Sequence, residues 1–285
     1  MVEFTNTEKA FADKSNTDLN RAYFLFKTIS NPKVSSLLTH LVKFALLIRL
    51  PITKIIKKTI YKHFCGGETI IDSKKTIDRL WKSSIGTILD YSAEGKETEI
   101  DFNNVLNETI QVIRASKDNK KIPFVVFKLT GLIKFKILEK LNNNDILNSN
   151  EQNEYKLFKE KINIICNETI LSKTPILIDA EESWIQDAID NIVLDLMKRY
   201  NNDDILIYNT LQFYRNDRIE YLNRLIEQSN KEGFKLGLKL VRGAYHQQEI
   251  NRAKQKNYSI PVYLNKEDTD KDFNQSLIKC LDNID

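Results

Sequence analysis

Cysteine, proline and glycine are all scarce in this sequence of 285 residues. The three cysteines, Cys65, Cys166 and Cys280, are odd in number and widely spaced. This excludes a disulfide framework and a Cys-x-x-Cys metal site, and it favours a reducing, cytoplasmic setting. With 8 glycines and 5 prolines, the sequence is neither collagen-like nor low in complexity. Each glycine is therefore expected where the backbone requires one.

The sequence also lacks a strong charge of one sign and a long apolar run. Lys and Arg number 43 against 39 for Asp and Glu, a net charge of +4 that argues against a dedicated nucleic-acid binder. The most apolar run, residues 41–50, is too short to span a bilayer and contains Lys43 and Arg49. Residues 1–16 are polar, which is not typical of a signal or transit peptide. The histidines lack metal-ligand spacing, so no metal site is expected.

Residues 1–85 read as a region of helices only. One helix is expected to open at residues 17–19 and to end near Asn31-Pro32, and residues 69–82 form another. Residues 33–64 are apolar and basic at helical spacing, with an interruption at Pro51. The basic side chains of this stretch are Lys43, Arg49, Lys54, Lys57, Lys58 and Lys62. They form either a solvated helix face or a surface that contacts a membrane or a partner.

From residue 86 to residue 285, short apolar runs alternate with helical stretches. The five runs are residues 87–91, 123–130, 175–180, 205–210 and 234–242. This alternation predicts a parallel β-sheet with crossover helices. Neither common glycine-rich nucleotide fingerprint is present, so a (β/α)₈ barrel is favoured over an open doubly wound sheet. The sequence supplies five of the eight units that a closed barrel needs.

Polar side chains gather where these predicted strands end. In a β/α barrel the chemistry lies at the carboxyl ends of the strands, so these side chains are expected on one rim. They are Asp90, Glu94, Lys128, Asp179, Gln212, Lys239, Arg242 and Tyr245. Their joint placement, more than any one of them, predicts a functional site.

Some of these residues also have a purely structural interpretation. Lys128 is costly inside an apolar strand unless it is paired or binds an anion, but a lysine at a sheet edge could reach water. Asp179 and Glu182 match a capping box for the next helix. Gln212 is either a polar loop residue or an amide that reads the edge of a planar heterocycle.

The segment from Lys239 to Tyr245 is the most specific in the sequence. Gly243 and Ala244, directly after a strand, let a bulky ligand approach the backbone, and their N–H groups suit a phosphate. Arg242 also suits phosphate, Tyr245 suits stacking, and Lys239 could stabilise a reduced flavin. The structural alternative is a glycine-containing turn with a basic surface.

Six segments together resemble the proline dehydrogenase family. They read KLVRGAY at 239–245 with Glu249 following, CGGETI at 65–70, TILDYSAEGK at 87–96, VFKLTGL at 126–132, LIDAEES at 177–183 and NTLQFYRND at 209–217. They occur in the order of the family and cover about residues 60–285. The resemblance implies a distorted (β/α)₈ barrel that uses FAD to oxidise L-proline to Δ1-pyrroline-5-carboxylate and passes the electrons to a membrane quinone.

The resemblance also implies roles for individual residues. Asp179 and Lys239 match catalytic positions, the second being Arg in many bacterial members. The substrate positions are Lys128, Tyr245 and Glu94. The FAD positions are Ala180, Gln212, Val241, Arg242, Gly243 and Ala244, with weaker similarity at Lys266 and Thr269.

Two other functions and one reservation stand beside this hypothesis. Lys128 or Lys239 could serve as the Schiff-base lysine of a barrel aldolase or lyase. A degenerate barrel could instead act as a binding module without activity. The two adjacent arginines with which the family clamps the proline carboxylate are absent, because no Arg-Arg pair occurs in the sequence. With three strands also lacking, we expect a chain truncated at its C-terminus, poorly soluble and inactive by itself.

Overall fold

The computed structural model describes residues 5–91 and 95–284, without the side chains of Ile55 and Lys58. It divides the chain into two compact units, Met1–Thr87 and Ile88–Asp285. The sequence pattern places the change from helices to alternating strands and helices between residues 85 and 86. We call the two parts the N-terminal unit and the C-terminal unit and describe each by itself.

The N-terminal unit contains helices throughout its described length. They are α1 (Thr7–Ala10), α2 (Asn16–Ile29), α3 (Pro32–Leu47), α4 (Thr53–Ile56), a π-helical segment (Lys57–Tyr61), α5 (Lys62–Phe64) and α6 (Ile70–Trp81). Hydroxyl and amide side chains set several starts: Ser15 accepts a bond from the Asp18 N–H, and Thr69 accepts one from the Asp72 N–H. The helices expected near 17–31, 33–64 and 69–82 are thus confirmed, including the interruption around Pro51.

Proline 32 has a different role from the one its position suggests. Pro32 follows the end of α2 and is also the first residue of α3, whose first turn is capped by the Asn31 side chain. None of the described side chains of α2 and α3 is buried. Among the described residues, no helix has the length and apolar character needed to cross a membrane.

The C-terminal unit alternates strands and helices. Its elements are β1 (Ile88–Asp90), α7 (Glu99–Ser116), β2 (Phe124–Phe127), a 3₁₀ turn (Leu129–Gly131), α8 (Phe135–Asn142), α9 (Ser149–Ser172), β3 (Ile176–Ile178), α10 (Ser183–Tyr200), β4 (Ile207–Gln212), α11 (Arg218–Glu232), β5 (Leu238–Val241), α12 (His246–Lys256) and α13 (Lys266–Leu281). Each of the five apolar runs coincides with one strand, so the predicted strands are confirmed; β4 continues two residues beyond the predicted run 205–210, to Gln212.

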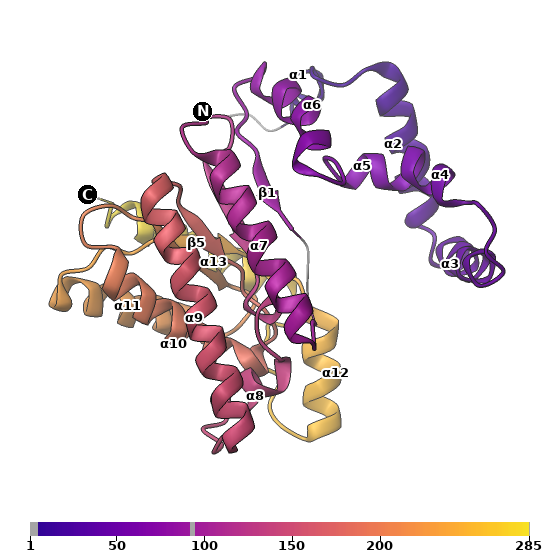
Figure 1. Ribbon diagram of the computed structural model, residues 1–285. Helices are drawn as coiled ribbons and strands as arrows, with labels where there is room; N and C mark the ends of the chain where they lie inside the picture. Colours follow the sequence, from indigo (N-terminus) through magenta and orange to yellow (C-terminus); the bar gives the residue numbers. More distant parts are fainter. Residues whose placement is uncertain (1–4, 92–94, 285) are drawn as a thin grey trace. The chain divides into compact units, whose positions relative to one another are not determined.

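The five strands form one parallel sheet in the order β1-β2-β3-β4-β5. Sequential parallel strands joined by helices are the arrangement of a β/α barrel. Helices α7 and α9 lie side by side in this unit (Figure 1). The capping box of Asn148 and Glu151 starts α9, the longest of the helices.

The two faces of the sheet differ in chemistry. Ile176 and Ile178 of β3 are fully buried, and Leu238 and Leu240 of β5 pack against a core cluster that includes Leu222. The opposite face carries Thr210, Gln212 and the other polar side chains of the strand ends. Alternation along each strand therefore separates an apolar face that packs on the helices from a face that holds the site.

The capping interpretation of Asp179 is wrong. Helix α10 begins at Ser183, and its N-cap residue is Glu182, whose own side chain makes no capping hydrogen bond. Instead Glu249 of α12 accepts bonds from the Ser183 N–H at 2.7 Å and its hydroxyl at 2.5 Å. Asp179 is therefore available for the site at the end of β3.

Candidate active site

Strand register brings four side chains of the candidate site to one level. Val126 pairs with Leu177, Leu177 with Tyr208, and Thr210 with Lys239. Two residues further along β2, β3 and β4, the same register places Lys128, Asp179 and Thr210 next to one another, in one row with Lys239 of β5. Side chains at this spacing point to the same face of a sheet, so the row follows from strand pairing alone.

These side chains open into a cavity of about 250 Å³ at the carboxyl edge of the sheet. It is lined by Lys128, Asp179, Ala180, Thr210, Gln212, Lys239, Val241, Arg242, Gly243, Ala244 and Tyr245. This lining contains every residue that the resemblance assigns to catalysis, to substrate binding or to FAD binding, apart from Glu94 and the more weakly similar Lys266 and Thr269. Glu94 lies outside the described residues.

An ion pair crosses the floor of this cavity. The Lys239 Nζ donates to Asp179 Oδ1 at 2.5 Å, and the Thr210 hydroxyl donates to the same oxygen at 3.5 Å. Both charged side chains keep part of their surface exposed, 32% for Lys239 and 22% for Asp179. The pair is therefore fixed in place and still accessible to a ligand.

Lys128 and Tyr245 meet on the other side of the cavity. The Lys128 Nζ donates to the Tyr245 hydroxyl at 3.0 Å and lies 5.6 Å from the centre of its ring. Lys128 is half-buried, directly after β2. The alternative of a lysine at a sheet edge is wrong, because β2 pairs with β1 on one side and with β3 on the other. The role of Lys128 in substrate binding stays a prediction.

Gln212 is held by a residue that the sequence analysis did not single out. Its side-chain N–H donates to the backbone oxygen of Glu181 at 2.7 Å. The Glu181 carboxylate in turn accepts bonds from Thr130, close to Lys128. Glu181 stands in the matched run LIDAEES, two residues after Asp179, and that spacing was the available signal. The sequence analysis also missed Thr210, although it lies two residues before Gln212 and therefore on the same face of β4.

Gly243 is required for a reason that the sequence analysis did not give, while the expected approach of a ligand to its backbone stays a prediction. Its φ of +130° favours glycine, and an added Cβ would lie 2.4 Å from the ring of Tyr214. The residue therefore admits the Tyr214 side chain. A larger residue at this position would first displace that ring, whether or not a ligand lies nearby.

Charged side chains at the open rim of the cavity pair with one another. The Arg242 Nε donates to Asp270 at 2.5 Å, its guanidinium lies 4.2 Å from the centre of the Phe273 ring, and Lys266 also bonds Asp270. The bonds to Lys266 and Arg242 hold the pKa of Asp270 below its usual value. Thr269 is buried in α13 and does not line the cavity.

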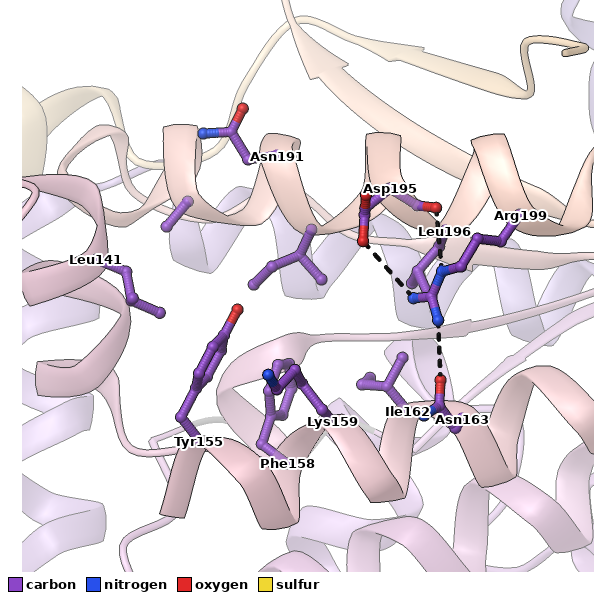
Figure 2. Close-up of a pocket in the computed structure, with 12 residues that line it drawn as sticks. Leu141, Tyr155, Phe158, Lys159, Ile162, Asn163, Asn191, Asp195, Leu196 and Arg199 are labelled. Atoms are coloured by element: carbon purple, nitrogen blue, oxygen red, sulfur yellow. Dashed lines mark hydrogen bonds and ion pairs between the residues drawn. The ribbon is translucent and has the colours of Figure 1, made fainter. Parts of the chain in front are cut away.

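A larger cavity, of about 460 Å³, lies away from the strand ends between α8, α9 and α10 (Figure 2). Its floor is apolar, with Phe158 and Leu196 among its residues. Its charged groups already interact with neighbours: Arg199 bonds Asn163, and Lys159 lies 4.9 Å from the centre of the Tyr155 ring. We place no chemistry there. In the described part of the chain, no group of His, Cys, Asp and Glu side chains is arranged to hold a metal ion.

A family model and several curated proteins match this sequence. The family model for proline dehydrogenase matches residues 73–285. The chain is 29% identical to mitochondrial proline dehydrogenase 1 of Dictyostelium discoideum, over 98% of this chain and 56% of that protein. It is 28% identical to the carbapenem antibiotics biosynthesis protein CarD of Pectobacterium carotovorum subsp. carotovorum, over 75% of this chain and 56% of that protein. The chain thus spans about half the length of the curated relatives it matches.

Solved structures show the same fold. Proline utilization A of Bdellovibrio bacteriovorus, inactivated by N-propargylglycine, superposes with a TM-score of 0.70 at 19% identity, over 97% of this chain and 30% of that one. The match of the family model covers most of the chain and includes every described residue of the cavity. This chain therefore belongs to the proline dehydrogenase family.

Proposed function

We propose that this chain carries the FAD and substrate sites of an enzyme that oxidises L-proline to Δ1-pyrroline-5-carboxylate. The observation that carries the proposal is one cavity, at the carboxyl edge of a parallel sheet, lined by Lys128, Asp179, Gln212, Lys239 and Tyr245. Strand ends of a β/α barrel are where such folds hold their chemistry. Membership of the proline dehydrogenase family favours this reaction over others.

The substrate side of the cavity suits a small amino acid with a negative carboxylate. Lys128 would bind the carboxylate through a charge-assisted hydrogen bond, and Tyr245 would pack on the ring of proline. Asp179 keeps Lys239 oriented through their ion pair. Positioning of this kind accelerates a reaction because the reacting atoms are held in contact before the barrier is crossed.

The residues present fit a flavin. Gln212 uses one of its two N–H groups on Glu181, so its amide oxygen and its second N–H are the groups it can offer to the edge of the flavin ring. Lys239 supplies the cation that a reduced, anionic ring requires, and Arg242 supplies one for phosphate at the rim. The cavity is smaller than the roughly 300–1,000 Å³ of common ligand pockets, so it would hold one end of FAD.

The chemistry asks three things of the protein. FAD, when bound, supplies the hydride acceptor. Proline loses its ammonium proton and a hydride from C5, and the nitrogen lone pair forms the new C=N bond. The protein must hold the carboxylate at Lys128, keep water from the reacting carbon with Tyr245, and keep the positive charge of Lys239 at the flavin site through Asp179.

A visible spectrum of the purified chain, with FAD added, tests the proposal. We expect bound flavin bands that bleach on addition of L-proline. N-propargylglycine should inactivate the chain, as it does the Bdellovibrio protein, and L-proline should protect. A folded chain that neither retains FAD nor responds to either compound contradicts the proposal. Trans-4-hydroxy-L-proline in the same assay measures the preference between the two substrates. The same preparation tests the sequence-based expectation of a poorly soluble chain that is inactive by itself: soluble protein that oxidises proline would show that expectation to be wrong.

A Schiff-base aldolase is the second candidate. Its nucleophile would be Lys239 or Lys128, but one is engaged by Asp179 and the other by Tyr245. An amine must be released from such partners before it can attack a carbonyl. Trapping by borohydride with a carbonyl substrate would favour this candidate, and a colourless, fully folded chain would accompany it.

We further propose a membrane quinone as electron acceptor, with the N-terminal unit at the cytoplasmic face of the membrane. Helix α3 and its end expose large apolar side chains together with basic ones. The apolar ones are Leu37, Leu41, Phe44 and Leu47, and the basic ones are Lys33, Lys43 and Arg49. We call this set the α3 surface. Apolar and basic groups together are typical of helices that lie on anionic lipid.

Vesicle sedimentation tests the α3 surface. We expect the chain to bind vesicles that contain phosphatidylglycerol, and to bind neutral phosphatidylcholine vesicles less. Leu41→Glu should weaken binding, whereas the exposed Lys156→Glu in α9 of the C-terminal unit should not. Equal binding of all variants to both kinds of vesicle contradicts a docking role.

A further inference from the structure

Glu181 is a buried acid next to the candidate site, with only 2% of its surface exposed. One carboxylate oxygen accepts a bond from the Thr130 N–H at 3.2 Å, and the other accepts one from the Thr130 hydroxyl at 2.5 Å. Thr130 belongs to the 3₁₀ turn that begins directly after Lys128. The carboxylate therefore holds the turn that directly follows Lys128, the lysine that we propose binds the substrate carboxylate.

The backbone of Glu181 holds a second side chain of the site. Its carbonyl oxygen accepts the Gln212 N–H at 2.7 Å, and its own N–H donates to Gln186 at 2.7 Å. Gln186 bonds Asp190, which pairs with Arg218 of α11. Glu181 thus joins β2, β4 and the helices behind them through buried hydrogen bonds, which are costly to leave unmade.

The charges around Glu181 oppose one another. Burial raises the pKa of its carboxyl to about 7, while the bonds from Thr130 and the positive charge of Lys128 act against this rise. Glu182 raises the pKa further. Asp179, two residues before Glu181, pairs with Lys239, and Asp190, which Gln186 connects to Glu181, pairs with Arg218. Neither pair is among the main influences on the pKa of Glu181. Lys128 is thus the cation that interacts most with Glu181.

We propose that Glu181 is a positioning residue of this site, which holds Lys128 and Gln212 in place and whose charge sets the affinity for the substrate carboxylate. This inference rests on the proposed function. A negative charge behind Lys128 reduces the positive potential that a carboxylate meets, and a neutral Glu181 restores it. By linkage, binding of a carboxylate to Lys128 favours protonation of Glu181 to the same extent.

Two substitutions separate the charge of Glu181 from its hydrogen bonds. Glu181→Gln keeps an acceptor for the Thr130 N–H and removes the charge. Glu181→Ala removes both and leaves a buried N–H without a partner. The matched control is Glu182→Gln, which changes the same charge at the adjacent, half-buried residue. KM and kcat for L-proline are measured with the FAD-loaded chain between pH 6 and pH 9.

The expected result is a change in KM that depends on pH. The ratio of wild-type KM to Glu181→Gln KM should be near one at pH 6 and rise to the order of threefold above pH 7, where the wild-type carboxyl is ionised. Taking this ratio cancels the titration of proline itself. Glu181→Ala should raise KM at every pH, and Glu182→Gln should leave the ratio flat. A flat ratio for Glu181→Gln, or equal effects of the two Gln variants, overturns the inference.

Urea unfolding gives a readout that does not need activity. A carboxyl whose pKa is raised on folding binds more protons in the folded state, so stability falls as pH rises between about 4.5 and 7. The midpoint of Glu181→Gln should therefore exceed that of wild type by a margin that grows over this window and then stays constant. If wild type and Glu181→Gln show the same pH dependence of the unfolding midpoint, the inference is overturned, whatever the kinetics with L-proline. A growing margin in a chain that never responds to proline would overturn the proposed function instead.

Discussion

The C-terminal unit and helix α3 of the N-terminal unit use apolar side chains in opposite ways. In the C-terminal unit, Ile113, Ile165 and Ile178 are completely buried between helices and sheet. In the N-terminal unit, helix α3 buries none of its described side chains, and Leu47 is 79% exposed. A sheet offers a broad face for helices to cover, whereas short helices need a second layer to bury their apolar stripe.

Ion pairs differ between the units in the same way. Arg218 and Asp190 of the C-terminal unit pair at 2.6 Å with side chains only 4% and 3% exposed. Arg79 and Asp13 of the N-terminal unit pair at 2.7 Å, but Arg79 is 46% exposed. Water screens the second pair, so its contribution to stability is small. We infer that buried contacts of the C-terminal unit, which also contains the candidate site, contribute most of the stability of the chain. The interactions of the N-terminal unit are largely exposed to solvent and contribute less.

The largest effect is expected from breaking the buried pair. Arg218→Ala leaves Asp190 charged and buried, which should lower the free energy of unfolding by about 3–5 kcal/mol. Arg79→Ala should change it by about 0–1 kcal/mol. The two tryptophans, Trp81 and Trp184, lie in different units. Urea unfolding followed by fluorescence, in chains that retain only one of them, reports each unit separately. A similar loss of unfolding free energy in both variants would contradict the difference between the ion pairs of the two units.

Core substitutions should give the next largest difference. Ile165→Ala removes a fully buried side chain of α9 and should destabilise the C-terminal unit by about 2–5 kcal/mol. Leu47→Ala should stay within about 0.5 kcal/mol, because its side chain is exposed. The same unfolding measurement checks both. A large loss for Leu47→Ala would show that α3 is packed in solution.

Lys128→Ala should reduce kcat/KM for L-proline about 10- to 150-fold while FAD stays bound. This corresponds to the roughly 1.5–3 kcal/mol of a charge-assisted hydrogen bond to the carboxylate. Asp179→Ala should also lower turnover sharply with FAD retained, because Lys239 loses its partner. Lys33→Ala, on the exposed start of α3, is the control from the other unit. Unchanged kcat/KM for Lys128→Ala would remove this lysine from the substrate site.

Gly243→Ala should destabilise the C-terminal unit by about 1–3 kcal/mol, from its positive φ and the contact with Tyr214. Gly233→Ala is matched, since that residue also has a positive φ but open space around its Cβ position. The loss at Gly243 should shrink in a Tyr214→Leu background, as measured by a double-mutant cycle. An unchanged loss in that background would assign the effect to the backbone alone.

Much of the fold could be predicted because the strands of the C-terminal unit are short, apolar and widely spaced. A strand of a parallel sheet is buried on both faces, so its residues are nearly all apolar. The run 175–180 can therefore be recognised as a strand from its own composition, without knowing which strands pair with it. Ten of the eleven main site residues line one cavity because parallel strands end at one edge. Glu94 stays a prediction. The capping interpretation of Asp179 failed because a local pattern competed with a partner, Lys239, sixty positions later.

The five strands of the C-terminal unit and the family were determined by the sequence itself, since they depend on composition and on motifs that lie within short segments. Tertiary structure alone decided which groups meet. Glu181 reaches Thr130 across 51 positions, and Gly243 meets the ring of Tyr214. Such contacts depend on the register between strands and on how side chains fill the space between them. No local pattern in the sequence encodes that geometry.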